Sequence, residues 1–434
     1  MEIVYERVAA IDVGKKEIAV TVRVPGQTRG IRTQQTRKFR TFYQVLRQMV
    51  GWLVEHGVTH VAMEATGVYW KPVFHALCEA DTLEVVLVNA RHVKNVPGRK
   101  TDVKDSEWLA QLLECGLLRG SFIPPKEIAA IRELTRYRKK TIQARTRELQ
   151  RLSKVLEDAG IKIDSVASSI TTLSARDMIE ALIAGERDPR RLADLARRRM
   201  KAKRSALIAA LDGRFDDHHA ELARMLLDQI DALSAQIVTL TTRIEALLEA
   251  AEPDDAGDRA HPPDDVGAAP AGPSTVERLT EIPGIGPTAA QIILAEIGRD
   301  MTQFPTAAHL VSWAKLCPRT IQSGPVTRGG KTGKGNPYLK GALGEAAAAA
   351  AKTDTFLGER YRRLAKRRGK LKALVAVARS ILIVIWHLLA NPAARFRDLG
   401  ADYHTNRIAI ERRLRNHIAQ LAAMGYHVTL EPAA

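Results

Sequence analysis

The chain of 434 residues carries 66 lysine and arginine residues against 49 aspartate and glutamate residues, a formal net charge of +17. This length suggests two or three domains, and the excess of positive charge favours a polyanionic partner, either nucleic acid or, as its rival, a membrane surface. Three scattered cysteines argue against a disulfide framework or a zinc site, and the first residues lack the basic and apolar regions of a signal peptide, so we expect a cytoplasmic protein.

Short apolar runs alternate with amphipathic stretches from residue 5 to residue 120, as strands and helices do in an α/β domain. The expected strands cover residues 8–12, 18–24, 38–41, 60–65 and 84–89, and the expected helices cover residues 43–56, 70–80 and 103–113. Two strands joined by a tight turn, a third strand and then strand–helix alternation follow the RNase H-like order. We therefore predict an α/β RNase H-like domain over residues 1–124.

Four acidic residues stand in this domain where a shared cation would need them. Asp12 ends the first apolar run and Glu64 lies inside another, while Asp102 and Asp105 open a helix. Spacing of three residues puts the last two carboxylates on one helical face. An unpaired carboxylate is costly in a buried strand, so the set predicts a hard cation such as Mg²⁺, which takes oxygen ligands. One or two such ions could hold the attacking and leaving oxygens of a phosphodiester.

Each acid taken singly also has an ordinary explanation. Asp12 could begin a turn before Gly14, and Asp102 could cap the helix that follows it. Asp105 would then be a favourable charge in the first helical turn. Glu64 resists such an explanation best because no turn lies near it, and the joint arrangement favours the metal site.

The pattern becomes helical over residues 125–250. A strongly basic segment, residues 132–154, carries one apolar stripe. A later helix carries a clearer seam with steps of three and four residues, formed by Leu226, Ile230, Leu233, Ile237, Leu240, Ile244 and Leu247. This heptad spacing predicts a coiled coil. The partner could be the first helix in an antiparallel hairpin or a second chain, and we favour the contact between chains.

Residues 251–275 are rich in proline, glycine, alanine and aspartate and predict a flexible linker before a C-terminal domain of residues 276–434. That domain opens with a Pro-Gly-Ile-Gly motif followed by small residues on a helix, which resembles a helix-hairpin-helix. Gly284 and Gly286 would let the backbone approach a DNA phosphate at the N-terminus of the helix. An ordinary helix–turn–helix is the alternative.

The C-terminal domain continues with a basic loop and an apolar helix. The loop is rich in glycine and carries Arg328, Lys331 and Lys334, which suits a phosphate backbone, although it lacks the glycine spacing of a P-loop. Ser323 at its edge would by itself more often be a turn residue than a nucleophile. The most apolar stretch, residues 373–390, contains charged Arg379 and therefore predicts a buried helix, not a membrane span.

These motifs together resemble those of the insertion sequence one-ten family of bacterial transposases, which are recombinases guided by a bridge RNA. The likeness rests on residues 11–14, 63–67, 96–105, 282–286, 323–324 and 334–336. It extends through both end domains and the helical middle. The segment before Ser323 is less serine-rich than the family leads us to expect, so Ser312 is a reserve candidate for the nucleophile.

The resemblance implies a RuvC-like domain with a DEDD acid set, a coiled coil and a mostly α C-terminal transposase domain. In that arrangement Asp12, Glu64, Asp102 and Asp105 would be catalytic and bind Mg²⁺, and Ser323 would be the nucleophile. Contacts to nucleic acid would come from Arg99, Lys100, Gly284, Gly286, Arg328, Lys331, Lys334 and Asn336. The implied partners are double-stranded donor and target DNA, a guide RNA and further copies of the chain in a dimer of dimers. Such a protein would associate with the nucleoid when active.

Serine chemistry would explain how DNA is rejoined without an added energy source. Attack by water would lose the energy of the phosphodiester bond, whereas a phosphoserine ester keeps it for the reverse reaction. Two rival functions stay open on the sequence. A RuvC-like metal-dependent, structure-specific endonuclease would release free ends by hydrolysis, and a non-enzymatic nucleic-acid scaffold would not need the four acids.

Overall fold

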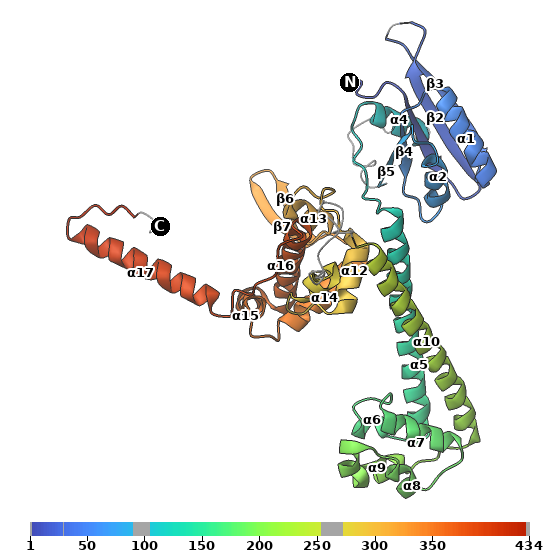
Figure 1. The fold of residues 1–434 in the computed structure, drawn as a ribbon, viewed down its shortest axis with the longest axis vertical. Helices are drawn as coiled ribbons and strands as arrows, with labels where there is room; N and C mark the ends of the chain where they lie inside the picture. The colour runs from blue at the N-terminus through green and yellow to red at the C-terminus, as the bar shows by residue number, and fades with distance from the viewer. Residues whose placement is uncertain (1, 29, 90–104, 253–271, 431–434) are drawn as a thin grey trace, which may run out of the picture. The chain divides into compact units, whose positions relative to one another are not determined.

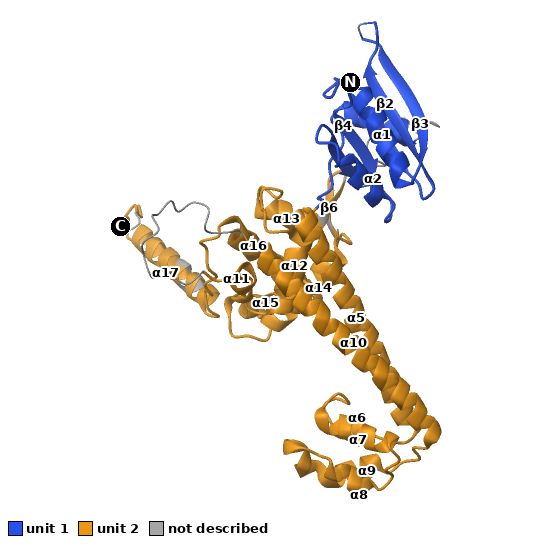
Figure 2. Ribbon diagram, turned by 45° about the vertical axis from the view of Figure 1, so that its right-hand side comes forward, with its two compact units in different colours: residues 1–123 blue, residues 124–434 orange. Residues whose placement is uncertain are grey.

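The computed structural model describes residues 2–28, 30–89, 105–252 and 272–430. The chain forms two compact units, Met1–Ile123 and Pro124–Ala434, which Figure 2 shows in separate colours. The first unit is mixed α/β and the second is almost entirely helical (Figure 1), which confirms the expected order of fold classes. The helical middle and the C-terminal part, expected as separate domains, belong to one compact unit.

A five-stranded sheet in the order β3-β2-β1-β4-β5 forms the first unit. Its strands are β1 Val8–Val13, β2 Glu17–Pro25, β3 Arg32–Arg40, β4 His60–Glu64 and β5 Glu84–Val88. The first three pair in antiparallel fashion, and β4 and β5 extend the sheet in parallel from β1. Parallel neighbours need crossover connections, which α1 (Tyr43–Glu55) and α2 (Trp70–Leu77) supply. The expected strands and helices of this unit are therefore confirmed, with β3 longer than its short apolar run indicates.

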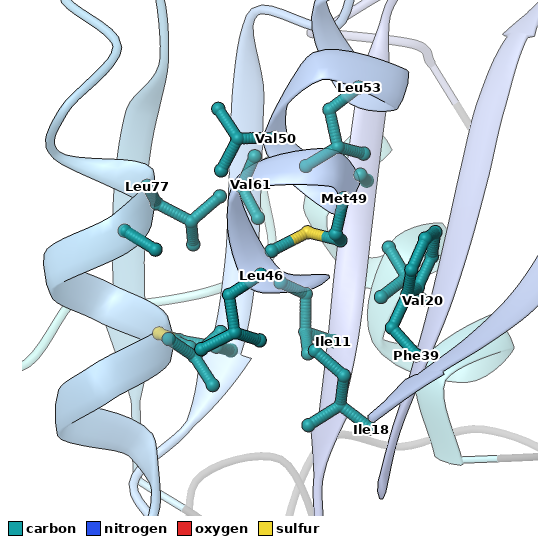
Figure 3. Close-up of a cluster of buried hydrophobic side chains, with 14 of the residues drawn as sticks. Ile11, Ile18, Val20, Phe39, Leu46, Met49, Val50, Leu53, Val61 and Leu77 are labelled. Atoms are coloured by element: carbon teal, nitrogen blue, oxygen red, sulfur yellow. The ribbon is translucent and has the colours of Figure 1, made fainter. Parts of the chain in front are cut away.

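The sheet buries both of its faces, each against different helices. On one face Ile11 and Val20 pack with Met49 and Leu53 of α1 and with Leu77 of α2 (Figure 3). The other face carries mainly small or short side chains and is covered by α4 (Asp105–Glu114). Its residues Val8, Ala10, Ala62 and Val88 form one cluster with Leu109, Ala110 and Leu113 of α4. Alternate residues of a strand face opposite sides of the sheet. The face on which a strand acid lies therefore follows from the buried residues next to it in the sequence.

The second unit begins with two long helices, α5 (Lys126–Asp158) and α10 (Asp217–Ala250), which pack against each other. Between them lie α6 Ile163–Val166, α7 Leu173–Ile183, α8 Pro189–Asp194, the 3-10 helix η1 Arg198–Lys203 and α9 Arg204–Leu211. These short elements turn the chain back, so that α10 returns along α5 (Figure 1).

For the heptad seam of α10 we favoured a partner in a second chain, and this expectation was wrong. The seam packs on α5 of the same chain, with Ile230, Leu240 and Ile244 buried. The apolar stripe of α5 gives it a local partner, since Leu152 of α5 and Ile230 share one hydrophobic cluster. A contact inside one chain needs no second molecule, and it leaves Leu233 half-buried.

The remaining elements of this unit include one apolar core helix, against which several of the others pack. They are α11 Thr275–Thr280, α12 Pro287–Ile297, α13 Ala307–Trp313, β6 Pro318–Ser323, β7 Val326–Thr332, α14 Pro337–Ala350, α15 Phe356–Arg368, α16 Lys370–Ala390 and α17 Tyr403–Ala423. Among the described residues α16 alone has the length and apolar composition of a membrane span. One of its faces, with Val377, Ile381 and Ile385, is buried, and the helix packs against α11, α13, α14 and α15, as expected for a core helix.

The segment expected to be a glycine-rich loop instead forms a two-stranded hairpin. Ser323 at the end of β6 pairs with Val326 at the start of β7, so only Gly324 and Pro325 make the turn. Gly324 has a φ of +58°, in the left-handed region that favours glycine. In the hairpin, the backbone N–H and C=O groups of each strand find hydrogen-bond partners on the other strand. A glycine-rich sequence by itself does not reveal this pairing.

Candidate active site

Two of the predicted acids occupy matching positions on neighbouring parallel strands. Ile11 of β1 is in register with Met63 of β4, and Asp12 and Glu64 follow them directly. Since Ile11 and Met63 face the α1 and α2 side, the two acids face the side that α4 covers. Asp12 has a solvent-accessible surface, although neighbouring atoms partly enclose its carboxyl group, and Glu64 is half-buried. The acids therefore mark the carboxyl ends of two central strands.

The third predicted acid, Asp105, is the first residue of α4 and lies near Asp12. Partial burial raises the pKa of the Asp12 carboxyl above its ordinary value, and the negative charge of Asp105 raises that pKa further. A cation bound here would relieve the repulsion that the charge of Asp105 exerts on the Asp12 carboxylate. Carboxylate oxygen atoms are the ligands that a hard divalent cation takes.

A chain of hydroxyl groups fixes the start of α4 over the sheet. Ser106, next to Asp105, hydrogen-bonds the hydroxyl of Thr21 in β2 at 2.9 Å, and both side chains are fully buried. Thr21 also hydrogen-bonds Thr36 of β3 at 2.8 Å. Thr21 pairs with Ala10, two residues before Asp12, so this contact ties the helix acid to the strand that bears its neighbour. Sequence reasoning missed both residues, although a threonine inside an apolar strand is a usable signal.

The other end of α4 is held by a buried carboxylate. Glu114 is 3% exposed and forms ion pairs with Arg23 of β2 at 2.7 Å and with Arg32 of β3 at 2.5 Å. The buried carboxylate needs these two arginines, because an unpaired buried charge is strongly destabilising. With its two ends fixed by polar contacts, α4 holds Asp105 at a defined place on the sheet.

The fourth acid, Asp102, and the expected contacts Arg99 and Lys100 lie outside the described residues. Within the described part of the chain, no three histidine, cysteine, aspartate or glutamate side chains are grouped closely enough to hold a metal ion. The acids that this part brings together are Asp12 and Asp105, with Glu64 on the adjoining strand.

The expected nucleophile and its basic neighbours belong to the second compact unit. Ser323 is the last residue of β6, beside the hairpin turn. Arg328 and Lys331 lie on β7 and Lys334 follows it, and all three are exposed. The reserve candidate Ser312 is exposed near the end of α13.

Two residues expected to contact nucleic acid have roles inside the protein. Gly284 has a φ of +91°, and a Cβ atom there would lie 2.2 Å from the carbonyl oxygen of Ala346 in α14. This glycine is therefore required for close packing against α14. Asn336 caps α14 by accepting hydrogen bonds from the backbone of Tyr338 and Leu339. Gly286, in contrast, is exposed at the start of α12, and a Cβ atom added there would have nothing within 4 Å.

Asn336 also contributes to a buried ionic cluster that the sequence did not reveal. Glu296 of α12 is fully buried and accepts two hydrogen bonds from the Arg136 guanidinium, at 2.7 and 2.8 Å. The amide of Asn336 donates to the same carboxylate at 2.5 Å, and Arg132 donates to its backbone carbonyl at 2.9 Å. The cluster joins α5, α12 and α14, which explains why the helical middle and the C-terminal part form one compact unit.

Comparisons with known sequences match both units. A family model described as a transposase, of the DEDD type of the IS110 family, matches residues 9–161. A second, described as the transposase IS116/IS110/IS902 family, matches residues 276–362. The first match spans Asp12, Glu64 and Asp105, and the second spans the β6–β7 hairpin.

Two similar proteins agree with these matches. A protein of Pseudomonas aeruginosa named "Probable family 20 transposase" is 26% identical over 340 residues, which cover 76% of this chain and 84% of that protein. A protein of Streptomyces coelicolor named "Insertion element IS110 uncharacterized 43.6 kDa protein" is 33% identical over 168 residues, which cover 38% of this chain and 36% of that protein. The class that these findings define is a DNA transposase. Within that class, the chain belongs to the IS110 family.

Proposed function

We propose that this transposase cuts and rejoins donor and target DNA through a phosphoserine intermediate. In this proposal Asp12, Glu64, Asp102 and Asp105 hold a divalent cation, Mg²⁺ by preference, and Ser323 is the nucleophile. The observation that carries the proposal is the approach of Asp105 to Asp12 at the carboxyl end of β1, where the charge of Asp105 opposes ionisation of Asp12. The DEDD type of the family supports use of a divalent metal.

The chemistry follows from the residues that the proposal names. A bound cation would activate the serine hydroxyl and offset the charge of the transferring phosphoryl group. The oxygen of Ser323 attacks the phosphorus and loses its proton, and the bond from phosphorus to the 3′ oxygen breaks. That oxygen leaves as a 3′ hydroxyl, and the 5′ phosphate stays on the serine. Arg328 and Lys331 bind neighbouring phosphates through their exposed charges.

Rejoining is the reverse of this reaction. The 3′ hydroxyl of a second strand attacks the phosphoserine, which restores both the DNA backbone and the free serine. No bond energy is lost to water, so the exchange needs no external energy source. A hydrolytic nuclease with the same acids would instead leave free 5′ phosphates.

We further propose that a guide RNA and additional copies of the chain take part, in the bacterial cytoplasm where the DNA lies. The basic segment of residues 132–154 is the first candidate contact with the RNA. Its exposed charges at Lys140, Arg147 and Lys154 repeat every seven residues along α5, so they line one side of the helix. Arg132 and Arg136 of the same segment are engaged with α12 instead.

The acid site is tested by strand cleavage with the purified protein, its flanking RNA and end-labelled DNA. Asp12→Asn and Asp105→Asn should each abolish cleavage in Mg²⁺ while folding and DNA binding persist, because each removes a cation ligand. Asp81→Asn, an exposed turn residue of the same unit, is the matched control and should cut normally. Near-normal cleavage by both site variants would refute the metal site.

A further inference from the structure

Helices α15 and α16 form a packed pair connected at Gly369 and carry a dense set of basic residues. Arg360, Arg363 and Arg367 recur on α15 at spacings of three and four residues, which places them on one face. On α16, Lys372 and Arg379 are seven residues apart and also share a face. Both are exposed.

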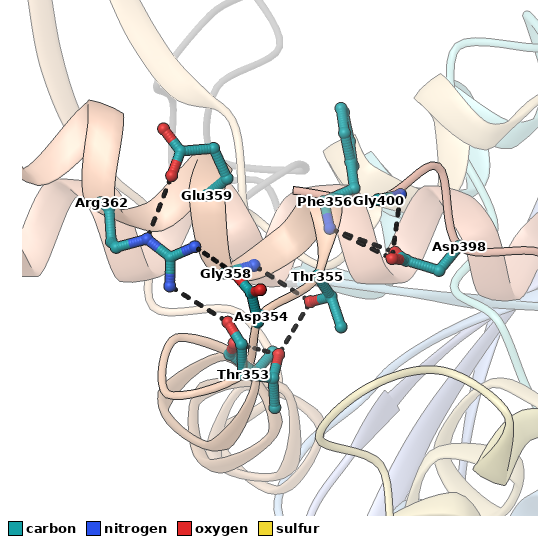
Figure 4. Close-up of polar contacts among 10 residues, drawn as sticks. Thr353, Asp354, Thr355, Phe356, Gly358, Glu359, Arg362, Asp398 and Gly400 are labelled. Carbon is teal, nitrogen blue, oxygen red and sulfur yellow. Dashed lines mark hydrogen bonds and ion pairs between the residues drawn. The ribbon is translucent and has the colours of Figure 1, made fainter. Parts of the chain in front are cut away.

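Arg362 of α15 has acidic and carbonyl partners for its guanidinium group and serves as a comparison for its neighbours. Arg362 donates to the carboxylate of Glu359 at 3.0 Å, to the carboxylate of Asp354 at 3.3 Å and to the carbonyl oxygen of Thr353 at 3.1 Å (Figure 4). Its charge and its donors therefore have partners within the turn before α15 and within the helix itself.

The arginines on either side of Arg362 in the sequence have no such partners. The Nε atoms of Arg360 and Arg363 are buried, and neither donates a hydrogen bond to any atom of the described residues. Burial lowers the pKa of Arg360, and the positive charges of Arg363 and Arg379 lower it further. The Arg360 guanidinium is thus near enough to Arg363 on its own helix and to Arg379 on the packed helix α16 to be repelled by both, and none of the three forms an ion pair with a described acid.

This arrangement is unfavourable for the protein alone. Like charges repel more strongly where solvent screens them less. A buried N–H group without an acceptor loses its hydrogen bonds to water and gains none in return. A bound anion would remove both costs. The planar guanidinium fork matches the oxygens of a phosphate, which it can bind through two parallel hydrogen bonds.

We propose that Arg360, Arg363 and Arg379 form a binding site for a phosphodiester of a nucleic-acid backbone, with Arg367 and Lys372 continuing the basic surface toward the next phosphates. The identity of the ligand rests on the proposed function as a DNA recombinase guided by RNA. The site itself depends on neither the acids nor Ser323. Contacts of this kind position the nucleic acid without reading its sequence.

The experiment measures binding of labelled duplex DNA, and of duplex RNA with the same sequence, across a range of salt concentrations. The variant R360Q/R363Q/R379Q should bind more weakly, and the slope of log K against log salt should fall by roughly 0.9 for each DNA phosphate that the variant no longer neutralises. The single variants Arg363→Gln and Arg362→Gln remove equal charge from adjacent positions. Only Arg363→Gln should reduce the slope. The nucleic acid that shows the larger change, DNA or RNA, is the ligand.

Thermal unfolding separates a binding site from a structural cluster. Inorganic phosphate at constant ionic strength should raise the melting temperature of the wild type more than that of Arg360→Gln. Without phosphate, Arg360→Gln should melt at the same temperature or higher, because a repulsion has been removed. A lower melting temperature in Arg360→Gln, together with unchanged salt slopes in all variants, would overturn the proposal.

The same measurements distinguish failure of this proposal from failure of the proposed function. Asp12→Asn should keep the full salt slope and the full stabilisation by phosphate, since its unit does not contain the arginines. If recombination proceeds without a phosphoserine while the arginine variants lose phosphate binding, only the proposed mechanism fails. If the arginine variants bind normally, only the phosphate site fails.

Discussion

At the scale of single residues, the pKa of Asp12 has a consequence for stability. Burial and the charge of Asp105 raise that pKa above its ordinary value, so the folded protein holds the proton more tightly than the unfolded chain does. The stabilising contribution of this carboxyl is therefore present at low pH and is lost as the pH rises through the raised pKa. At neutral pH the ionised Asp12 opposes folding.

We expect Asp12→Asn to raise the melting temperature at pH 7 in EDTA, because it removes the repulsion from Asp105. Mg²⁺ should then raise the melting temperature of the wild type but have little effect on the variant. Differential scanning calorimetry at pH 4 and pH 7 provides the check, since the gain from the substitution should shrink at the lower pH. A variant that is less stable than wild type at pH 7 in EDTA would contradict this account of the pair.

Residue patterns predicted some site positions and not others. Asp12 and Glu64 interrupt apolar runs, and that interruption is local, so the sequence alone could indicate a site at the strand ends. The contact of Ser106 with Thr21 joins positions 85 residues apart and has no local signature. Gly284 was expected to approach a phosphate, but the close approach that needs a glycine is to α14, and periodicity cannot tell which backbone comes near.

At the scale of elements, the α5–α10 hairpin explains what the heptad seam does. A pattern of apolar residues predicts a helical partner but not whether that partner belongs to the same chain, because both contacts bury the same side chains. The short helices between α5 and α10 decide the outcome by reversing the chain. The β6–β7 hairpin makes the same point about strands. Its glycine-rich sequence does not indicate strands, and only the pairing seen in the structure identifies them.

The packing of this hairpin predicts a difference between two aliphatic residues of α10. Ile244 is fully buried and Val238 is 65% exposed. Ile244→Ala should lower the free energy of unfolding by about 2–5 kcal/mol, through reduced burial and the cavity left behind. Val238→Ala should change it by less than about 0.5 kcal/mol. Urea unfolding followed by circular dichroism measures both, and equal costs would show that the seam is not packed within the chain.

At the scale of the whole molecule, the basic residues behind the net charge of +17 serve different purposes. Several basic residues are used inside the protein, as Arg132 and Arg136 are with Glu296. Others, such as the exposed row along α5, remain available to a polyanion. Composition alone could predict a nucleic-acid partner, but only the structure separates the arginines that hold the fold from those that face solvent.

The exposed row predicts where the guide RNA binds. Arg147→Gln should weaken binding of the flanking RNA and reduce the salt slope by roughly 0.7–0.9, the effect of one phosphate that is no longer neutralised. Arg151→Gln removes the same charge one helical turn further on, but Arg151 is paired with Glu148 at 2.9 Å and should have a smaller effect. Filter binding at several salt concentrations gives both slopes. Equal slopes for the two variants and the wild type would place the RNA elsewhere.

The central claim, a phosphoserine at Ser323, is tested most directly by a denaturing gel of end-labelled DNA. The wild-type protein, given Mg²⁺, its flanking RNA and a substrate nicked to prevent rejoining, should give a covalent protein–DNA species that resists hydroxylamine. The adduct should carry the 5′ phosphate and leave a free 3′ hydroxyl. Ser323→Ala should form no adduct, and Ser312→Ala, the matched control, should form it normally. Loss of the adduct in Ser312→Ala alone would move the nucleophile to that residue, and free ends without any adduct from the wild type would show a hydrolase and contradict the recombinase mechanism.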